Sequence, residues 1–462
     1  MDTKAVFEKW MNRVTEKYRD RAPGSAKLYE KAQRYLPGGD TRTVTFFKPY
    51  PLFMARGEGF KLYDFDGNEY IDFLNNYTAL IHGHSHPEII RVVTEQLKKG
   101  VSFAGPTESQ SRLAEIICER VKSVEQIRFC NTGTEATMNA IRAARIFSGK
   151  SKVVKTEGGY HGTHDLAEVS ISPKLEDAGP ISKPRSVPQS RGIPKSILKE
   201  VIVVPFNNKQ ATETIIRRHQ EEIACVIVEP MIGSGGCIPQ AEGYLEFLRD
   251  LTRKLRILLI FDEIVTFRLG TGGLQGVYGI EADLTTFGKI IGGGFPVGAF
   301  GGSGKIMKIF SPQEKGFVSH SGTFNGNPVT VEAGIVCLKE LTPEAIGRIN
   351  SLGNLLGRKA DLAFEKNGIR GKTTGLGSLT HLHFNAETIR DYRSVSKGNF
   401  QAMLLVHMEL LARGIYVAPR GGEIAISTPM TEKEVDVFIT AFGDSLHEIR
   451  PFIEETTPEL IQ

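Results

Sequence analysis

The stretch "DLTTFGKIIGGGFPVGAFGG" (residues 283–302) places a single lysine, Lys289, between a short apolar run and a series of glycines. The apolar run predicts a buried strand, and the glycines let the backbone approach a ligand closely. A lysine at this point serves either as a clamp for a phosphate or as a nucleophilic amine. The motifs elsewhere in the chain decide between these two uses.

Similar apolar runs recur from about residue 80 to 335, where they alternate with helical patterns. They lack the strict alternation of apolar and polar residues, as expected for strands that are covered on both faces. Strands that alternate with helices favour a parallel sheet, so the sequence predicts an α/β fold. The predicted strands are "IRFC" (127–130), "KVVKT" (152–156), "ACVIVEP" (224–230), "ILLIFDE" (257–263) and "DLTTFG" (283–288).

The two ends of the chain have a different pattern. The first 35 or so residues predict helix, ending at "LPGGD" (36–40), and "DFDGN" (64–68) marks a hairpin between two alternating segments. From about residue 336 the pattern changes to helices with short strands, which indicates a smaller lobe. The short strands are expected in "SLTHLHF" (378–384), "IYVAP" (415–419) and "EIAIS" (423–427).

Composition excludes several classes of protein. The 462 residues carry a net charge of +4 without a basic block, so neither nucleic acid nor an anionic membrane is an expected partner. No apolar run approaches the roughly 20 residues of a membrane span, and the charged opening lacks a signal-peptide core. The five cysteines have no CxxC spacing, so we expect free thiols in a reducing cytoplasm.

Chemically active residues stand where predicted strands end. Glu229 closes "ACVIVE", Asp262 closes "ILLIFD", and Lys289 follows "DLTTFG". Ligands of open α/β sheets bind outside the carboxyl ends of the strands, so these residues predict one shared site. The turn "NTGTEA" (131–136) joins another strand to its helix. Its Gly133 and Thr134 would bind a phosphate at the helix N-terminus, or Thr134 would only cap the helix.

Motif checks exclude a nucleotide as the source of that phosphate. "AFGGSGKI" (299–306) lacks the first glycine and the hydroxyl residue of a P-loop, and no G-x-G-x-x-G follows a strand. An acid at a strand end, a lysine after a later strand and a phosphate turn fit pyridoxal phosphate. Lys289 would then form a Schiff base, and Asp262 would keep the pyridine nitrogen protonated. Each residue alone would more commonly be a surface salt-bridge partner.

Six motifs in order resemble the class III, fold-type I aminotransferases over nearly the whole chain. The resemblance implies the pyridoxal 5'-phosphate cofactor, with Lys289 as the Schiff-base lysine. It also implies a large cofactor-binding domain over residues 76–335 and a smaller α+β domain built from residues 1–75 and 336–462. The motifs are "NTGTEA", "GGYHGTHD", "VEPMIG", "LLIFDEIVTFR", "DLTTFGKIIGGGFPVGAFGG" and "HSGTFNGNP".

The same resemblance assigns further roles. Tyr160 would stack on the pyridine ring, and Glu229 would lie near the phenolic oxygen of the cofactor. Thr323 would reach the phosphate of the neighbouring subunit's cofactor, which implies a homodimer with shared active sites. Many relatives carry glutamine two or three residues after Glu229, where this chain has "MIG" (231–233), so the hydrogen bonding of the phenolic oxygen differs.

Two groups within the class are the most similar. The stretch "SFAGPTES" (102–109) and the long proline-rich loop from about residue 166 to 195 resemble glutamate-1-semialdehyde aminomutase. "PGGDTRTVTFFKPYPL" (37–52), "NNYTALIHGHSHPEI" (75–89) and "YVAPRGGEIAIS" (416–427) resemble the β-amino-acid (β-phenylalanine) aminotransferases. The aminomutase pattern has no arginine at the position of Arg420. The sequence therefore favours a transaminase that moves an amino group from a β-amino acid to a 2-oxo acid by a ping-pong mechanism.

Arg42, Tyr77 and Arg420 are the expected substrate-binding residues. A guanidinium grips a carboxylate with two hydrogen bonds, and a transaminase acts on two different acids. The alternative is a purely structural role, in which one of the two arginines forms an ion pair with an acid such as Glu423. An aminomutase, a racemase or epimerase on the same scaffold, and an inactive binding protein stay open as other functions.

Two other features need interpretation. The histidines of "HGHSH" (82–86) and "YHGTHD" (160–165) could hold a metal by composition alone, but the resemblance makes the first a structural turn, and we expect no metal. The segment from about Leu166 to Lys195 carries five prolines, which prevent a regular helix. We expect it to act as a lid or entrance loop.

Overall fold

The computed structural model describes residues 3–419 and 422–462 and divides the chain into two compact units. We call Pro87–Ile346 with Arg390–Ser396 the large unit, and Met1–His86 with Gly347–Ile389 and Lys397–Gln462 the second unit. The short segment from Arg390 belongs to the large unit, which the sequence did not indicate. The domain limits expected from the sequence stay a prediction.

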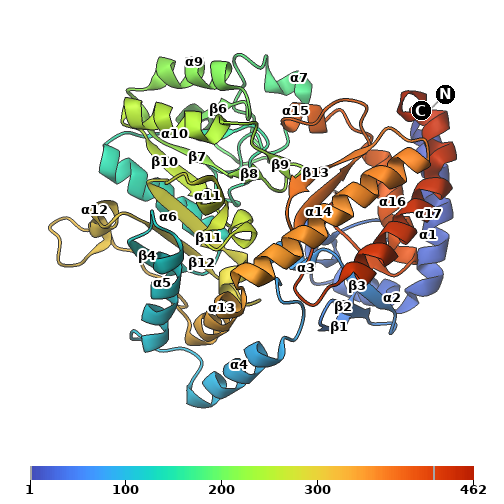
Figure 1. Cartoon of the computed structure of the whole chain (residues 1–462), viewed down its shortest axis with the longest axis horizontal. Helices are drawn as coiled ribbons and strands as arrows, with labels where there is room; N and C mark the ends of the chain where they lie inside the picture. The colour runs from blue at the N-terminus through green and yellow to red at the C-terminus, as the bar shows by residue number, and fades with distance from the viewer. Residues whose placement is uncertain (1–2, 420–421) are drawn as a thin grey trace. The chain divides into compact units, whose positions relative to one another are not determined.

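A seven-stranded sheet forms the centre of the large unit, in the order β4-β12-β11-β10-β7-β5-β6 (Figure 1). Neighbouring strands from β11 to β6 are parallel, whereas β12 is antiparallel to both β11 and β4. All strands except β12 therefore point the same way. Their bounds are β4 Gln126–Cys130, β5 Lys152–Thr156, β6 Val201–Val204, β7 Ile223–Val228, β10 Leu258–Asp262, β11 Leu284–Gly288 and β12 Gly298–Gly302.

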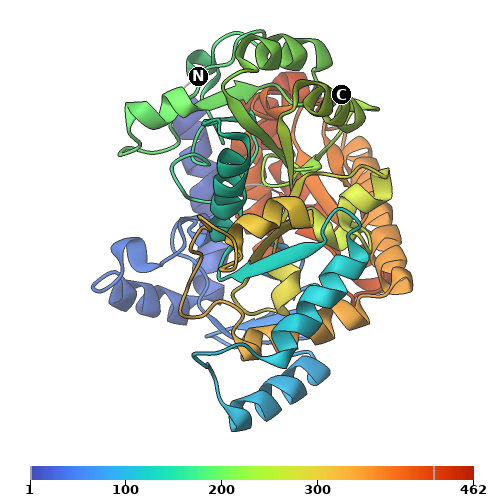
Figure 2. The ribbon, with the colours of Figure 1, turned by 90° about the vertical axis from the view of Figure 1, so that its left-hand side faces the viewer.

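Helices of the large unit pack on this sheet because its strands are apolar on both faces. Helix α6 (Gly133–Ser148) presents Ala140, Ala143 and Ala144, whose small side chains bring it close to β7, β10, β11 and β12. Figure 2 views the unit from its β4 edge, with α5 beside that strand. The other long helices are α4 Pro87–Lys99, α5 Glu108–Arg120, α9 Lys209–His219, α10 Tyr244–Leu255 and α13 Pro328–Glu340.

The structure confirms all five predicted strands and adds β6 and β12 to the sheet. Strand β12 has the sequence "GAFGG", which carries little strand propensity. Its glycines are needed for another reason, because a Cβ atom on Gly298 would lie 2.0 Å from the carbonyl oxygen of Thr132. A Cβ atom on Gly302 would lie 2.4 Å from the carbonyl oxygen of Asp283. At these two positions glycine allows the backbone of β12 to approach neighbouring backbone closely.

We expect Gly298→Ala to destabilise the large unit, by about 1–3 kcal/mol or more, since the neighbouring atom is backbone that cannot rotate away. The matched control is Gly276→Ala, at an exposed position of helix α11 (Gly273–Tyr278), where a new Cβ atom meets nothing within 4 Å. Denaturant unfolding of both variants checks this. Equal stability of the two variants would contradict the packing role of Gly298.

The second unit contains a four-stranded and a three-stranded sheet with helices around them. The expected hairpin is present as β2 and β3, and Asp64 accepts hydrogen bonds from the backbone of Asp66 and Asn68 in its turn. The predicted N-terminal helix is broken at Pro23 into two helices. The bounds are α1 Thr3–Arg21, α2 Pro23–Ala32, β1 Met54–Glu58, β2 Lys61–Asp64, β3 Glu69–Asp72, β13 Lys372–Leu376, β14 Leu379–His383, β15 Ile415–Tyr416, β16 Glu423–Ala425, α14 Pro343–Lys366, α16 Phe400–Ala412 and α17 Glu432–Thr456.

The proline-rich segment of residues 166–195 contains one short helix, α7 (Leu175–Ala178), and is bonded to its surroundings. The backbone of Ser170 donates to Val187 at 2.7 Å, and the Arg393 guanidinium donates to the carbonyl of Gly179 at 2.8 Å. That this segment moves as a lid stays a prediction. Such a movement would have to break the two hydrogen bonds described above. Across residues 3–419 and 422–462, no helix is long and apolar enough to cross a membrane.

Candidate active site

The carboxyl ends of the parallel strands bring most of the predicted site residues to one edge of the sheet. Asp262 is the last residue of β10, Glu229 directly follows β7, and Lys289 directly follows β11. Tyr160 lies in the loop after β5, and Gly133 opens the helix after β4. The strand order β4-β12-β11-β10-β7-β5 places these ends along the same edge.

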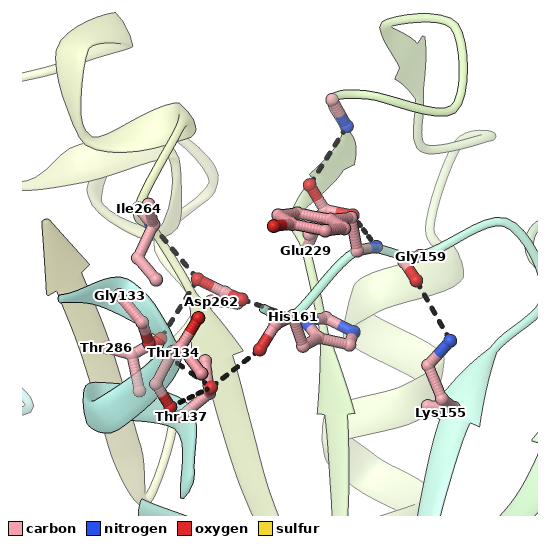
Figure 3. Close-up of polar contacts among 12 residues, drawn as sticks. Gly133, Thr134, Thr137, Lys155, Gly159, His161, Glu229, Asp262, Ile264 and Thr286 are labelled. Carbon is pink, nitrogen blue, oxygen red and sulfur yellow. Dashed lines mark hydrogen bonds and ion pairs between the residues drawn. The ribbon is translucent and has the colours of Figure 1, made fainter. Parts of the chain in front are cut away.

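Asp262 is buried and its carboxylate is fixed by three neighbours (Figure 3). Its Oδ1 accepts hydrogen bonds from Thr286 Oγ1 at 3.0 Å and from the backbone of Ile264 at 3.2 Å. Its Oδ2 lies 2.8 Å from Nδ1 of His161. A carboxylate held from several sides cannot turn away, so its charge stays available to a cationic partner.

His161 is a site residue that the sequence interpretation considered only as a metal ligand. Burial lowers the pKa of its ring below the ordinary value, against the opposing hydrogen bond with Asp262. Because a carboxylate only accepts, the proton of the neutral ring lies on Nδ1. Its buried Nε2 has no hydrogen-bond partner among the residues that the structure describes. Its place in the sequence, directly after the predicted ring-stacking residue Tyr160, could have identified His161 as a site residue.

Helix α6 offers its N-terminus at the same edge. Its cap is Thr132, whose Oγ1 accepts from the backbone of Glu135 at 3.1 Å, so the alternative that Thr134 caps the helix is wrong. Thr134 instead accepts from the backbone of Thr163 at 3.2 Å. A Cβ atom on Gly133 would lie 2.7 Å from Cδ1 of Ile264, so a larger residue there would require the Ile264 side chain to move. The N–H groups of the first helical turn suit an anion.

Lys289 is half-buried and has a backbone conformation that is rare for its residue type. Its φ angle of 49° places it in the left-handed region, at the start of the turn Lys289–Gly292. Such a conformation costs roughly 1–2 kcal/mol for a residue with a Cβ atom, and it concentrates at functional sites. The turn directs the chain abruptly away from β11 at the strand's carboxyl end.

Glu229 is buried, and burial together with the charge of Asp262 raises the pKa of its carboxyl to about 8. It accepts hydrogen bonds from the backbone of Tyr160 at 2.9 Å and from the backbone of Gly233 at 3.1 Å. The backbone N–H of Gly233, the last residue of "MIG", therefore donates to one carboxyl oxygen of Glu229. Tyr160 is 39% exposed, so part of its side chain is accessible to a ligand.

The remaining predicted residues lie elsewhere. Thr323 is exposed in the loop before α13. In the second unit, the Arg42 guanidinium donates to Asn76 Oδ1 at 2.7 Å and lies 4.9 Å from the ring centroid of Tyr77. Both residues line a cavity of about 450 Å³ within that unit. Arg420 lies outside the described residues.

Tyr77 belongs to a short stretch with an unusual backbone. Asn75, Asn76, Tyr77 and Thr78 all have positive φ angles, between 50° and 72°. The hydroxyl of Tyr77 donates to the carbonyl of Val44 at 2.8 Å, which holds the ring beside Arg42. Four successive left-handed residues without glycine are strained, and strain of this kind is typical of functional segments.

The histidines of "HGHSH" contact protein groups in the second unit. His84 Nε2 lies 2.7 Å from Asp72 Oδ2, and His82 Nδ1 lies 3.0 Å from Thr428 Oγ1. These contacts fix the turn that precedes α4. Within residues 3–419 and 422–462, no three His, Cys, Asp or Glu side chains are grouped so as to hold a metal ion.

A family model described as aminotransferase class-III matches residues 46–435. The chain belongs to this family. A glutamate-1-semialdehyde 2,1-aminomutase of Methanopyrus kandleri is 40% identical over 435 residues, which cover 94% of this chain and 99% of the relative. A beta-phenylalanine transaminase of Variovorax paradoxus is 38% identical over 442 residues, or 96% of each chain. The solved omega-transaminase from Sphaerobacter thermophilus is 43% identical, with a TM-score of 0.88 over 92% of this chain and 98% of that one.

These comparisons confirm the predicted fold type, enzyme class and cofactor. Class III aminotransferases have the fold-type I architecture and depend on pyridoxal 5'-phosphate. The described residues fit this cofactor, since the edge of the sheet offers an anion-binding helix end, a fixed buried carboxylate and a lysine. The orphan Nε2 of His161 lies buried beside that carboxylate and leaves a polar atom for a ligand.

Proposed function

We propose that this protein is a transaminase that moves an amino group from a hydrophobic β-amino acid to a 2-oxo acid by a ping-pong mechanism. The observation that carries the substrate class is the cavity beside Arg42 and Tyr77. A guanidinium binds a carboxylate, and apolar walls suit a hydrocarbon or aromatic side chain. The apolar walls include Leu36, Pro51, Leu52, Phe53, Leu74 and Leu80.

The proposed roles of the site residues follow from their chemistry. Bound pyridoxal phosphate supplies an electrophilic carbon and an electron sink. Lys289 would hold the cofactor through Nζ, and its amine, once displaced by the donor, would move the proton at the reacting carbon. Asp262 would hold a proton at the pyridine nitrogen, with His161 fixing its orientation. Gly133 and Thr134 would bind the phosphate, and Tyr160 would cover the ring.

We also propose a homodimer with shared active sites, located in the cytoplasm. Support for the dimer is Thr323, which is exposed in the single chain although the family pattern assigns it to a cofactor phosphate. Neighbouring Phe324 is 59% exposed, which a partner surface would cover. The five free cysteines support a reducing compartment.

A second candidate is glutamate-1-semialdehyde aminomutase activity, which isomerises one substrate without a separate acceptor. It is favoured by the curated relatives, because several aminomutases are 38–41% identical to this chain. A racemase or epimerase would use the same lysine. The test is a panel of β- and α-amino donors with 2-oxoglutarate and pyruvate, run beside glutamate-1-semialdehyde alone. Isomerisation without transfer to any acceptor would replace the transaminase proposal with the aminomutase.

Arg42→Ala and Arg420→Ala should separate the two substrates. Losing a charge-assisted grip should cost about 2–3 kcal/mol, which is roughly a 30- to 150-fold loss of kcat/KM. We expect one variant to lose mainly the amino donor and the other mainly the 2-oxo acid. Steady-state kinetics with each substrate varied in turn measures the two losses.

The matched control for Arg42 is Arg56→Ala. Arg56 lies 3.5 Å from the ring centroid of Tyr63, a similar stacked arrangement, but it is exposed and pairs with Glu58. This variant should retain normal kinetics. If Arg420→Ala leaves every donor and acceptor unaffected, the sequence feature that separates this chain from the aminomutase pattern has no role in substrate binding, and the aminomutase proposal gains weight.

A further inference from the structure

A second lysine, Lys155, is buried in the large unit close to the candidate active site. It lies within β5, which is paired on one side with β7 and on the other with β6, and it is 1% exposed. Burying a lysine is costly unless its ammonium is bonded, and burial here lowers its pKa to about 7. A buried lysine in a central strand therefore needs a reason.

Both hydrogen bonds of Lys155 Nζ go to backbone carbonyls of one loop. Nζ donates to the carbonyl of Gly159 at 2.9 Å and also to the carbonyl of Val169. These carbonyls stand at the two ends of residues 159–169, which carry Tyr160 and His161. The backbone of Gly158 donates to Ser170 at 3.0 Å beside them. Lys155 thus closes the base of the loop from within the sheet.

The peptide group between Gly159 and Tyr160 is held at both of its polar atoms. Its carbonyl accepts from Lys155, and its N–H donates to the Glu229 carboxylate (Figure 3). Because both polar atoms of this peptide are bonded to buried side chains on opposite sides, its plane is fixed. That plane sets the direction in which the Tyr160 side chain leaves the backbone.

The two acidic side chains near Lys155 have different partners. Glu229 and Glu157 both attract its ammonium. Glu157 is also engaged by Arg393, whose Nε and Nη2 donate to its two oxygens at 2.6 and 3.0 Å. Lys155 itself forms its hydrogen bonds with carbonyls of the loop. Its hydrogen bonds therefore connect the two ends of the loop and do not form an ion pair.

We propose that Lys155 is a positioning residue, which holds both ends of the loop 159–169 so that Tyr160 faces the cofactor ring and His161 faces Asp262. The proposal rests on the proposed function, since it assumes that these side chains serve the cofactor. It assigns Lys155 no contact with the substrate. Without these two hydrogen bonds, the protein would keep Lys289 at the end of β11, but the loop would no longer hold the Tyr160 side chain in a fixed orientation.

The test compares Lys155→Met with the control Lys152→Met, both as holoenzymes. Lys152 lies on the same strand but is more exposed and pairs with Glu222 at 2.7 Å. Lys155→Met should still bind pyridoxal phosphate covalently, measured as cofactor fixed by borohydride reduction. Its visible circular dichroism should weaken, because the ring environment is less ordered, and kcat should fall roughly 10- to 100-fold. Lys152→Met should match the wild type in both readouts.

Lys155→Gln provides a second variant, because its shorter amide still donates but reaches fewer carbonyls, and its circular dichroism should be intermediate. Wild-type circular dichroism and kcat in either folded Lys155 variant would overturn the proposal. Failure of both variants to fold would assign Lys155 to stability alone and would also overturn it. If the wild type itself fixes no cofactor on reduction, the proposed function fails instead, so the two failures are distinguishable.

Discussion

Replacing Lys289 with alanine is expected to lower turnover by several orders of magnitude while the protein remains folded. Lys289 provides the amine at the carboxyl end of β11, in the turn that begins the glycine-rich segment. Alanine removes that amine, and no neighbouring backbone group can replace it as a nucleophile. The cofactor should then bind without a covalent bond and be lost on dialysis, and the visible absorbance of the dialysed protein measures this.

The control for this variant is Lys305→Ala. Lys305 is the lysine of "GGSGKI", the segment that resembles an incomplete P-loop, and it is exposed with its Nζ 5.6 Å from the ring centroid of Phe147. This change should leave both the cofactor and the turnover intact. Substantial transamination by purified Lys289→Ala, after its cofactor content is matched to the wild type, would show that another amine performs the reaction.

The second large effect is expected for Asp262→Asn. Asparagine has nearly the same shape and its oxygen can still accept from Thr286 and the backbone of Ile264. It has no negative charge, however, so the pyridine nitrogen of the cofactor loses the partner that keeps it protonated. Proton removal from the donor should therefore slow by orders of magnitude. Single-turnover measurements with the donor alone isolate this step.

A second acid of the same unit provides the comparison. Asp283 accepts two hydrogen bonds from Arg249, at 2.6 and 3.1 Å, at the opposite end of β10. Asp283→Asn should lower the free energy of unfolding, because it weakens a partly buried ion pair, yet leave the single-turnover rate unchanged. A normal single-turnover rate in Asp262→Asn would remove the electrostatic role from Asp262.

The sequence predicted those parts of the fold that depend on local pattern. Apolar runs identified the parallel strands, and the residues at their ends identified Glu229, Asp262 and Lys289 as site candidates. This succeeds because burial on both faces of a parallel sheet leaves a continuous apolar run. The turn "DFDGN" identified its hairpin for a similar reason, since the Asp64 side chain bonds the turn's own backbone.

The parts that the sequence did not reveal depend on neighbours distant in the chain. Strand β12 forms by pairing with β11 and β4, and its Gly298 and Gly302 are needed because the carbonyls of Thr132 and Asp283 leave no room for a Cβ atom. Lys155 lies within the predicted strand "KVVKT", and its hydrogen bonds with the carbonyls of Gly159 and Val169 are visible only in the structure. His161 is explained by its contact with Asp262, about a hundred residues further along the chain.

The most direct test of the central claim is a half-reaction with purified holoenzyme. A hydrophobic β-amino acid is added without any acceptor, and the visible absorbance of the cofactor is followed together with the release of oxo acid. We expect the absorbance to bleach, one equivalent of 3-oxo acid to form per active site, and added 2-oxoglutarate or pyruvate to restore the absorbance. If β-amino donors leave the absorbance unchanged, while glutamate-1-semialdehyde is isomerised without an acceptor, the protein is not a β-amino-acid transaminase.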